Sequence, residues 1–138
     1  ALAKEAELVT GGHRSALGGT FYEPTLLSHC TDDMLIASEE TFGPVAACFR
    51  FETEQEAINR ANNTPFGLAA YFYTKDLSRV FRVSEALEAG MIGINDTGVS
   101  SAVAPFGGVK ESGIGREGSV LGLEEYLDVK TLHLGNLG

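Results

Sequence analysis

The sequence contains no tryptophan, only two cysteines, and no apolar run close to the roughly 20 residues that a membrane-spanning helix needs. Cys30 and Cys48 are too few for a disulfide framework and fit a reducing compartment. Residues 1–6 lack an initiator methionine and the apolar stretch of a signal peptide. We therefore expect a cytoplasmic protein with no membrane partner, and a chain that begins inside a longer one.

Basic residues are also scarce. Ten lysines and arginines stand against 19 aspartates and glutamates, which gives a formal net charge of −9. A protein that binds a phosphate backbone needs a basic face, so we expect no nucleic acid partner. The histidines, His13, His29 and His133, lie far apart without the spacing of metal ligands, so no metal site is predicted. Cys30 follows His29, but adjacent side chains on an extended chain point to opposite faces, so this pair is not expected to be catalytic.

The hydrophobic pattern predicts alternating strands and helices. An apolar run at 45–51, which includes Cys48, predicts a buried strand, and Thr53 and Glu56 form the pattern of a capping box. Two βαβ units follow, and such units almost always form a parallel sheet with right-handed crossovers, so the expected fold class is α/β. The expected elements are strands at 8–10, 45–51, 68–73 and 91–94, an extended segment at 21–27, a helical turn at 32–35, a helix at 53–62, and a helix at 77–89 that is followed by Gly90 and buries Leu77, Val80, Phe81, Ser84 and Leu87.

The C-terminal part follows a different pattern. Residues 97–115 are rich in glycine and predict a long loop, residues 116–127 predict a helix, and residues 129–134 predict a final strand. A terminal strand without a neighbour exposes unpaired backbone groups, which favours pairing with another chain.

Glu40 and Phe42 stand two positions apart, next to Gly43 and Pro44. In an extended segment such residues project to the same side. There a carboxylate can accept two hydroxyl hydrogens from a ribose, and a phenyl ring can pack on a flat heterocycle. The alternative, from spacing alone, is that Glu40 is solvated and Phe42 belongs to the core.

The loop at 105–113 allows two interpretations. Its glycines could expose backbone N–H groups to a phosphate, but it lacks the P-loop order and the G-x-G-x-x-G spacing. A close-packed wall with Phe106 pointing into a pocket is the preferred interpretation. Just before it, Ser100 and Ser101 either donate hydrogen bonds to a carboxylate ligand or are ordinary turn residues.

Together these motifs resemble the aldehyde dehydrogenase superfamily. Glu-x-Phe-Gly-Pro at 40–44 resembles the motif whose glutamate holds the nicotinamide ribose, and residues 105–117 resemble the family's C-terminal signature. Residues 66–73, 76–83 and 115–119 are similar to succinate-semialdehyde dehydrogenases in particular. The resemblance covers essentially the whole chain, with the motifs in order.

The resemblance implies NAD or NADP as the cofactor. Glu40 would bind the nicotinamide ribose, and Phe42 would pack against the nicotinamide. Ser100 matches the serine that binds the substrate carboxylate in the semialdehyde enzymes, and Phe106 matches an aromatic wall of the aldehyde pocket.

The same resemblance implies an intact enzyme that oxidises succinate semialdehyde to succinate. Residues 1–115 would be the C-terminal part of its catalytic domain, and residues 116–138 a terminal helix and oligomerisation strand. The family's nucleophile lies upstream and neither Cys30 nor Cys48 aligns with it, so no catalytic residue is assigned and the chain alone is expected to be inactive. The expected partners are a small aldehyde, the remainder of the enzyme and homo-oligomer subunits. Two alternatives stay open: another substrate such as glutarate semialdehyde, and a non-catalytic structural or oligomerisation module.

Overall fold

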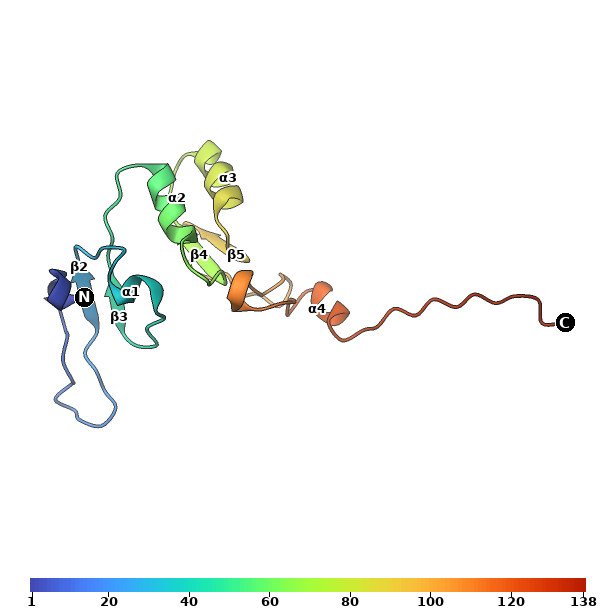
Figure 1. Ribbon diagram of the computed structural model, residues 1–138, viewed down its shortest axis with the longest axis horizontal. Coiled ribbons are helices and arrows are strands. Elements are labelled where there is room, and N and C mark those ends of the chain that lie inside the picture. Colours follow the sequence, from blue (N-terminus) through green and yellow to red (C-terminus); the bar gives the residue numbers. More distant parts are fainter. The chain divides into compact units, whose positions relative to one another are not determined.

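The computed structural model describes residues 1–138, which divide into two compact units (Figure 1). The first unit, Ala1–Ala57, contains a three-stranded sheet in the order β1–β2–β3. Its central strand, β2, pairs antiparallel with β1 and parallel with β3. The elements of this unit are the 3₁₀ turn η1 (Leu2–Lys4), β1 (Glu7–Thr10), β2 (Thr25–Ser28), α1 (Leu35–Ser38) and β3 (Val45–Ala47).

The core of the first unit is small. Ala6, Leu27, Cys30 and Met34 are buried, and the partly buried Ile36, Val45, Ala47 and Phe49 pack against them.

The apolar run at 45–51 forms a shorter and more exposed strand than predicted. Val45, Ala47 and Phe49 are partly buried, whereas Ala46 and Cys48 between them are exposed. This alternation is that of a strand with only one covered face. The prediction that Cys48 packs as a buried hydrophobe is therefore wrong for this structure.

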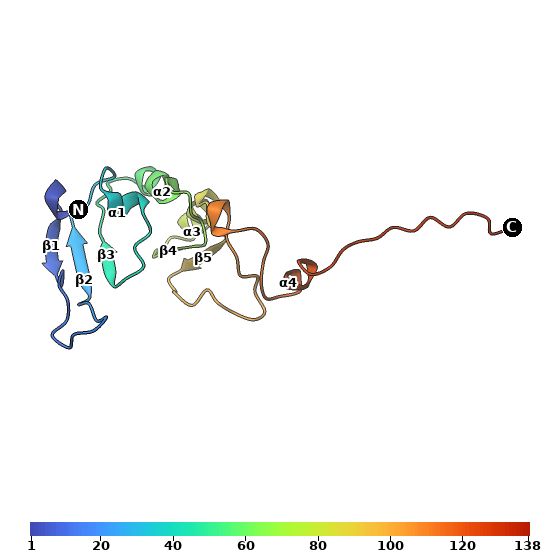
Figure 2. The same cartoon turned by 60° about the horizontal axis from the view of Figure 1, so that its bottom comes forward.

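The second unit, Ile58–Gly138, is built around a parallel pair of strands, β4 and β5. The strands run in register from Ala69 opposite Met91 to Phe72 opposite Ile94, and α3 connects them. Figures 1 and 2 show α2 and α3 side by side. The elements are α2 (Glu54–Asn62), which begins in the last residues of the first unit, β4 (Ala69–Phe72), α3 (Leu77–Ala86), β5 (Met91–Ile94), η2 (Lys110–Ser112) and α4 (Leu121–Glu124).

Of the two predicted βαβ units, one forms within a single sheet. β4, α3 and β5 make the expected parallel unit, and the strand predicted at 91–94 is observed with those bounds. β3 instead pairs with β2. The α/β class is therefore confirmed, but the continuous parallel sheet of β3, β4 and β5 is not what the structure contains.

The helix start predicted from the capping box at 53–56 is observed at α2, and α3 also begins at a capping residue. At α2, the Thr53 hydroxyl accepts a hydrogen bond from the Glu56 N–H (3.2 Å), while the Glu56 carboxylate accepts from the Glu52 N–H (2.9 Å) rather than from Thr53. At α3, the Asp76 carboxylate accepts from the N–H groups of Ser78 and Arg79.

The buried face of α3 differs from the prediction. Val83 is the buried residue of this helix, whereas Leu77 and Phe81 are 69% and 62% exposed. The helix ends at Ala86, so Gly90 does not follow its end directly as a C′ residue.

The C-terminal predictions are mostly not met. The helix expected at 116–127 forms only over Leu121–Glu124, because Glu117 pairs with Phe106 and because Gly118 and Ser119 have φ values of 65° and 50°. Residues 129–134 form no strand, since no neighbouring strand of the chain pairs with them. None of the helices combines the length and apolar character that crossing a membrane requires.

Candidate functional site

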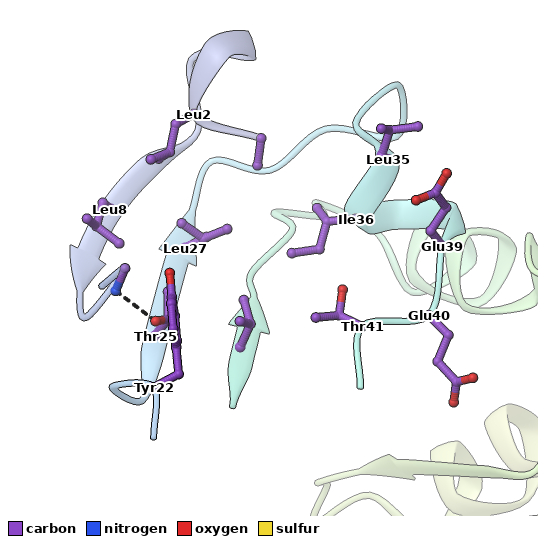
Figure 3. Close-up of a pocket in the computed structure, with 13 residues that line it drawn as sticks. Leu2, Leu8, Tyr22, Thr25, Leu27, Leu35, Ile36, Glu39, Glu40 and Thr41 are labelled. Carbon is purple, nitrogen blue, oxygen red and sulfur yellow. Dashed lines mark hydrogen bonds between the residues drawn. The ribbon is translucent and has the colours of Figure 1, made fainter. Parts of the chain in front are cut away.

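The segment that carries Glu40 follows α1 and borders an open cleft of about 370 Å³ in the first unit (Figure 3). Glu40 is exposed, and its carboxylate points away from Leu27 and Ile36. The cleft is lined by Ala1, Leu2, Leu8, Gly12, Tyr22, Thr25, Leu27, Leu35, Ile36, Glu39, Glu40, Thr41 and Val45.

Phe42 is 96% exposed, so its interpretation as a core residue is wrong for this structure. The backbone around it makes two consecutive tight turns, in which Gly43 N–H donates to the Thr41 carbonyl (3.0 Å) and Val45 N–H donates to the Gly43 carbonyl (2.8 Å). The segment is therefore curved, and strand alternation does not place Glu40 and Phe42 on one side. It does present a carboxylate and an aromatic ring to solvent.

In the second unit, Phe106 is held by backbone pairing with Glu117. Phe106 N–H donates to the Glu117 carbonyl at 2.8 Å, and Glu117 N–H donates to the Phe106 carbonyl at 2.7 Å. The adjacent Arg116 guanidinium donates to the carbonyls of Gly108 (2.8 Å) and Gly115 (2.7 Å). These bonds close the segment into a loop whose two ends are tied together.

The N–H groups of this loop are largely used within the chain. Val109 N–H donates to the Gly67 carbonyl (3.0 Å), and Glu111 N–H donates to the Pro65 carbonyl (2.9 Å). The Ser112 hydroxyl in turn accepts from the Gly67 N–H (2.8 Å). These bonds occupy the amides of Val109 and Glu111, which leaves fewer N–H groups of the loop for a phosphate.

Close glycine contacts support the alternative, a packed wall. A Cβ added at Gly90 would lie 1.9 Å from the Gly107 carbonyl oxygen, so only glycine fits between β5 and the loop. Phe106 itself is half-buried and borders an open cleft of about 420 Å³. This cleft is lined by Leu68, Phe106, Gly107, Gly108, Ser112, Gly113, Ile114, Gly115, Arg116, Glu117, Glu125 and Tyr126.

Ser100 is exposed in an irregular segment and is not among the residues that line the Phe106 cleft. Its neighbour Ser101 starts a turn, in which the Ser101 carbonyl accepts from the Ala104 N–H at 3.2 Å. Glu40 and Phe42 belong to the first unit and Ser100 and Phe106 to the second.

Sequence reasoning assigned no role to Lys110, Ser112 or Arg116, although all three stand in the motif at 105–117. Each reaches a backbone group of a neighbouring segment or of the loop itself. Their residue types carry no signal for such contacts, which depend on which segments the fold brings together.

One carboxylate has a clearly shifted pKa, and it lies outside these motifs. The Lys4 ammonium, which donates to Asp33 at 2.8 Å, and then the Thr31 hydroxyl hold the pKa of the Asp33 carboxyl below its ordinary value.

The two cysteines occupy different environments. Cys30 is 4% exposed in the core of the first unit, whereas Cys48 is exposed. Their backbones are joined by a hydrogen bond from Cys30 N–H to the Cys48 carbonyl at 3.1 Å. A buried thiol without access to a substrate does not act as a nucleophile.

Comparison with known proteins decides the family. Residues 1–132 match the Aldehyde dehydrogenase family. The chain belongs to the aldehyde dehydrogenase family. It is 56% identical over 137 residues to 3-sulfolactaldehyde dehydrogenase of Pseudomonas putida and to succinate semialdehyde dehydrogenase of Acinetobacter baylyi, covering 99% of this chain and 28% of each relative.

Solved aldehyde dehydrogenases share its fold. Succinate-semialdehyde dehydrogenase from Burkholderia pseudomallei is 60% identical with a TM-score of 0.89, over 91% of this chain and 26% of that one. Betaine aldehyde dehydrogenase from Staphylococcus aureus, in complex with NAD⁺, is 45% identical with a TM-score of 0.86, again over 91% and 26%. This aldehyde dehydrogenase chain therefore spans between a quarter and a third of the length of the proteins that it matches.

Proposed function

We propose that this chain is the C-terminal part of an NAD(P)-dependent aldehyde dehydrogenase that oxidises succinate semialdehyde to succinate. The observation that carries the proposal is the match of 99% of the chain to the semialdehyde enzyme of Acinetobacter baylyi at 56% identity. The motifs at 40–44 and 105–117 also support the proposal, because they resemble the family motifs that contact the cofactor and the substrate.

On the cofactor side, Glu40 would accept hydrogen bonds from the nicotinamide ribose and Phe42 would pack against the nicotinamide ring. Their exposure fits this role, since the carboxylate and the ring are both accessible to a ligand. The nicotinamide, when bound, supplies the hydride acceptor for aldehyde oxidation. The residues of this chain orient it and leave the redox chemistry to the cofactor.

On the substrate side, Ser100 would donate a hydrogen bond to the carboxylate of the semialdehyde, and Phe106 would form an apolar wall beside its carbon chain. The exposure of Ser100 leaves its hydroxyl available. The backbone bridge between Phe106 and Glu117 supports this role, because it restrains the backbone that carries the phenyl ring.

The nucleophile and the base would come from outside this chain. Cys30 is in the core, Cys48 is exposed just after β3, and neither aligns with the family's catalytic cysteine. We therefore expect no turnover from the isolated chain. Residues 116–138 would serve assembly, with 129–134 pairing as a strand with another subunit of a homo-oligomer.

The test is kinetic and uses the full-length enzyme. We expect reduction of NAD⁺ or NADP⁺ with succinate semialdehyde, and a clear preference for it over butanal, which lacks the carboxylate. Ser100→Ala should reduce this preference about tenfold, since a hydrogen bond to a charged group contributes about 1.5–3 kcal/mol. An unchanged preference would remove Ser100 from the site, and a burst of NADH from the isolated chain would contradict its proposed inactivity.

Another semialdehyde is the first alternative. The names of the relatives favour an aldehyde that carries an anionic group without selecting one member, since one relative is a 3-sulfolactaldehyde dehydrogenase and another is a glutarate-semialdehyde dehydrogenase of Pseudomonas aeruginosa. Comparing kcat/KM for succinate and glutarate semialdehydes decides between them.

A non-catalytic structural or oligomerisation module is the second alternative. The unpaired segment 129–134 favours it. The reading frame that encodes the chain distinguishes the two: upstream sequence with a catalytic cysteine and a dinucleotide fold supports the enzyme, and a start codon directly before Ala1 supports the module.

A further inference from the structure

Lys110 joins the glycine-rich loop to the end of α2. Its ammonium donates to the carbonyls of Asn62 (2.8 Å) and Thr64 (3.1 Å) and forms an ion pair with Glu88. Its side chain is only 25% exposed. This single residue therefore connects the loop to two segments that lie far from it in the sequence.

The contact is favourable for a physical reason. Asn62 is the last residue of α2, and the last carbonyls of a helix have no partner within the helix and carry its partial negative charge. A lysine there satisfies the carbonyls and complements the charge. Asn62 also accepts a hydrogen bond from the Glu88 N–H and donates one to the Ala86 carbonyl, so the end of α2 is itself fixed to the end of α3.

The backbone of Lys110 indicates that these contacts hold it in place. Its φ is 56°, in the left-handed region that lysine seldom occupies and glycine tolerates. A strained conformation of this kind persists when the surrounding structure determines it. Here the side-chain contacts with Asn62, Thr64 and Glu88 hold Lys110 in this conformation.

The link from Lys110 to Phe106 is short and closely packed. Gly108 is buried, Gly107 lies against Gly90, and Val109 N–H is bonded to the Gly67 carbonyl. A displacement at Lys110 would therefore be transmitted to Phe106, because the Gly90 contact restrains Gly107 and the Gly67 hydrogen bond restrains Val109.

We propose that Lys110 is a positioning residue, which sets the place of the Phe106 wall by fastening the glycine-rich loop to the end of α2. The proposal rests on the function proposed above, in which Phe106 borders the aldehyde. Lys110 itself does not touch the substrate, because its ammonium is occupied by two carbonyls and a carboxylate.

The experiment compares Lys110→Met and Lys110→Arg in the full-length enzyme, with Lys75→Met as the matched control at an exposed lysine between β4 and α3. KM is measured for the cofactor, for the best semialdehyde and for an uncharged aldehyde of the same length. Lys110→Met should raise KM for both aldehydes about fivefold, because small misplacements at a site are costly, and should leave the cofactor KM unchanged. Lys110→Arg should keep the aldehyde KM values close to those of the wild type, and Lys75→Met should leave all KM values unchanged.

Other patterns overturn the proposal. A rise in KM confined to the carboxylated aldehyde would mean that Lys110 binds the substrate directly. Unchanged aldehyde KM values with a lower melting temperature would mean that Lys110 only stabilises the fold. Lys110→Gly suits the positive φ and is the second variant if Lys110→Met does not fold; it should give the same rise in aldehyde KM, and a wild-type KM would refute the role.

The outcome is separable from that of the proposed function. If the wild-type enzyme prefers an aldehyde other than succinate semialdehyde, the substrate assignment fails, and the Lys110 comparison is made with the preferred aldehyde.

Discussion

The two motif segments, 40–44 in the first unit and 105–117 in the second, are supported to different degrees by their own chain. Phe42 is 96% exposed, the backbone around it makes two tight turns, and one hydrogen bond, from Thr25 N–H to the Pro44 carbonyl, joins the segment to β2. The loop with Phe106 is instead bonded to 65–67, to the end of α2 and to itself. One segment is presented to solvent, and the other is built into the fold.

This difference indicates where each segment obtains its shape. Contacts with backbone groups of this chain determine the geometry of the loop at 105–117. Changes at those contacts should therefore lower the stability of the protein. The segment at 40–44 has few such contacts, so its final arrangement should depend on the ligand or on the remainder of the enzyme.

The largest expected effect comes from placing a methyl group at Gly90. Its Cβ would lie 1.9 Å from the Gly107 carbonyl oxygen, and backbone rather than a flexible side chain would have to move. We expect Gly90→Ala to destabilise the full-length enzyme by about 3 kcal/mol, the upper range for overpacking. Thermal unfolding and amide hydrogen exchange over residues 103–112 measure it.

Gly43→Ala is the matched change in the other segment. No atom of the chain lies within 4 Å of a Cβ at Gly43, so stability should change by no more than about 0.5 kcal/mol. Equal losses for the two variants would break the comparison. A rise in the cofactor KM of Gly43→Ala without a loss of stability would strengthen the comparison, because the added methyl group would then obstruct a ligand that is not part of the chain.

A smaller effect is expected at the start of α3. Asp76 accepts from Ser78 N–H at 2.9 Å, whereas α1 of the first unit begins after Met34 without a side-chain cap. Asp76→Ala should cost about 1 kcal/mol of stability, and Asp76→Asn, which keeps an acceptor oxygen, should cost much less. Denaturant unfolding of the full-length enzyme measures both, and equal losses would show that the cap is not the cause.

The sequence was sufficient for elements defined by local chemistry. The strand at 91–94 and the start of α2 follow from an apolar run and from a capping box, which act within a few positions. The helix expected at 116–127 failed because Glu117 pairs with Phe106, a contact that residue preferences do not encode. Gly90 was expected to follow the end of a helix and instead makes room for Gly107, for the same reason.

The candidate site divides along similar lines. The residues Glu40, Phe42, Ser100 and Phe106 were proposed from motifs, and the structure places the first three on exposed segments and Phe106 in a bonded loop. The supporting role of Lys110 was not predictable, since it depends on the positive φ of Lys110 and on the nearby end of α2. The motif resemblance thus proposed residues for contact with a ligand, and it carried no signal for the residue that fastens the loop.

The smallest expected effect concerns pH and the first unit. Lys4 and then Thr31 lower the pKa of the exposed Asp33 carboxyl, so the charged form is favoured in the folded state. The resulting stability is fully present above the unfolded pKa of an aspartate, about 3.9, and is lost as the pH falls through the lower folded pKa. The stability difference between the wild type and Asp33→Asn should therefore be constant above about pH 4 and shrink below it. Added salt should reduce this difference at every pH, because the Lys4–Asp33 ion pair is exposed. Unfolding at stepped pH measures this difference. A difference that grows on acidification would mean that the contact with Lys4 does not favour the charged carboxylate.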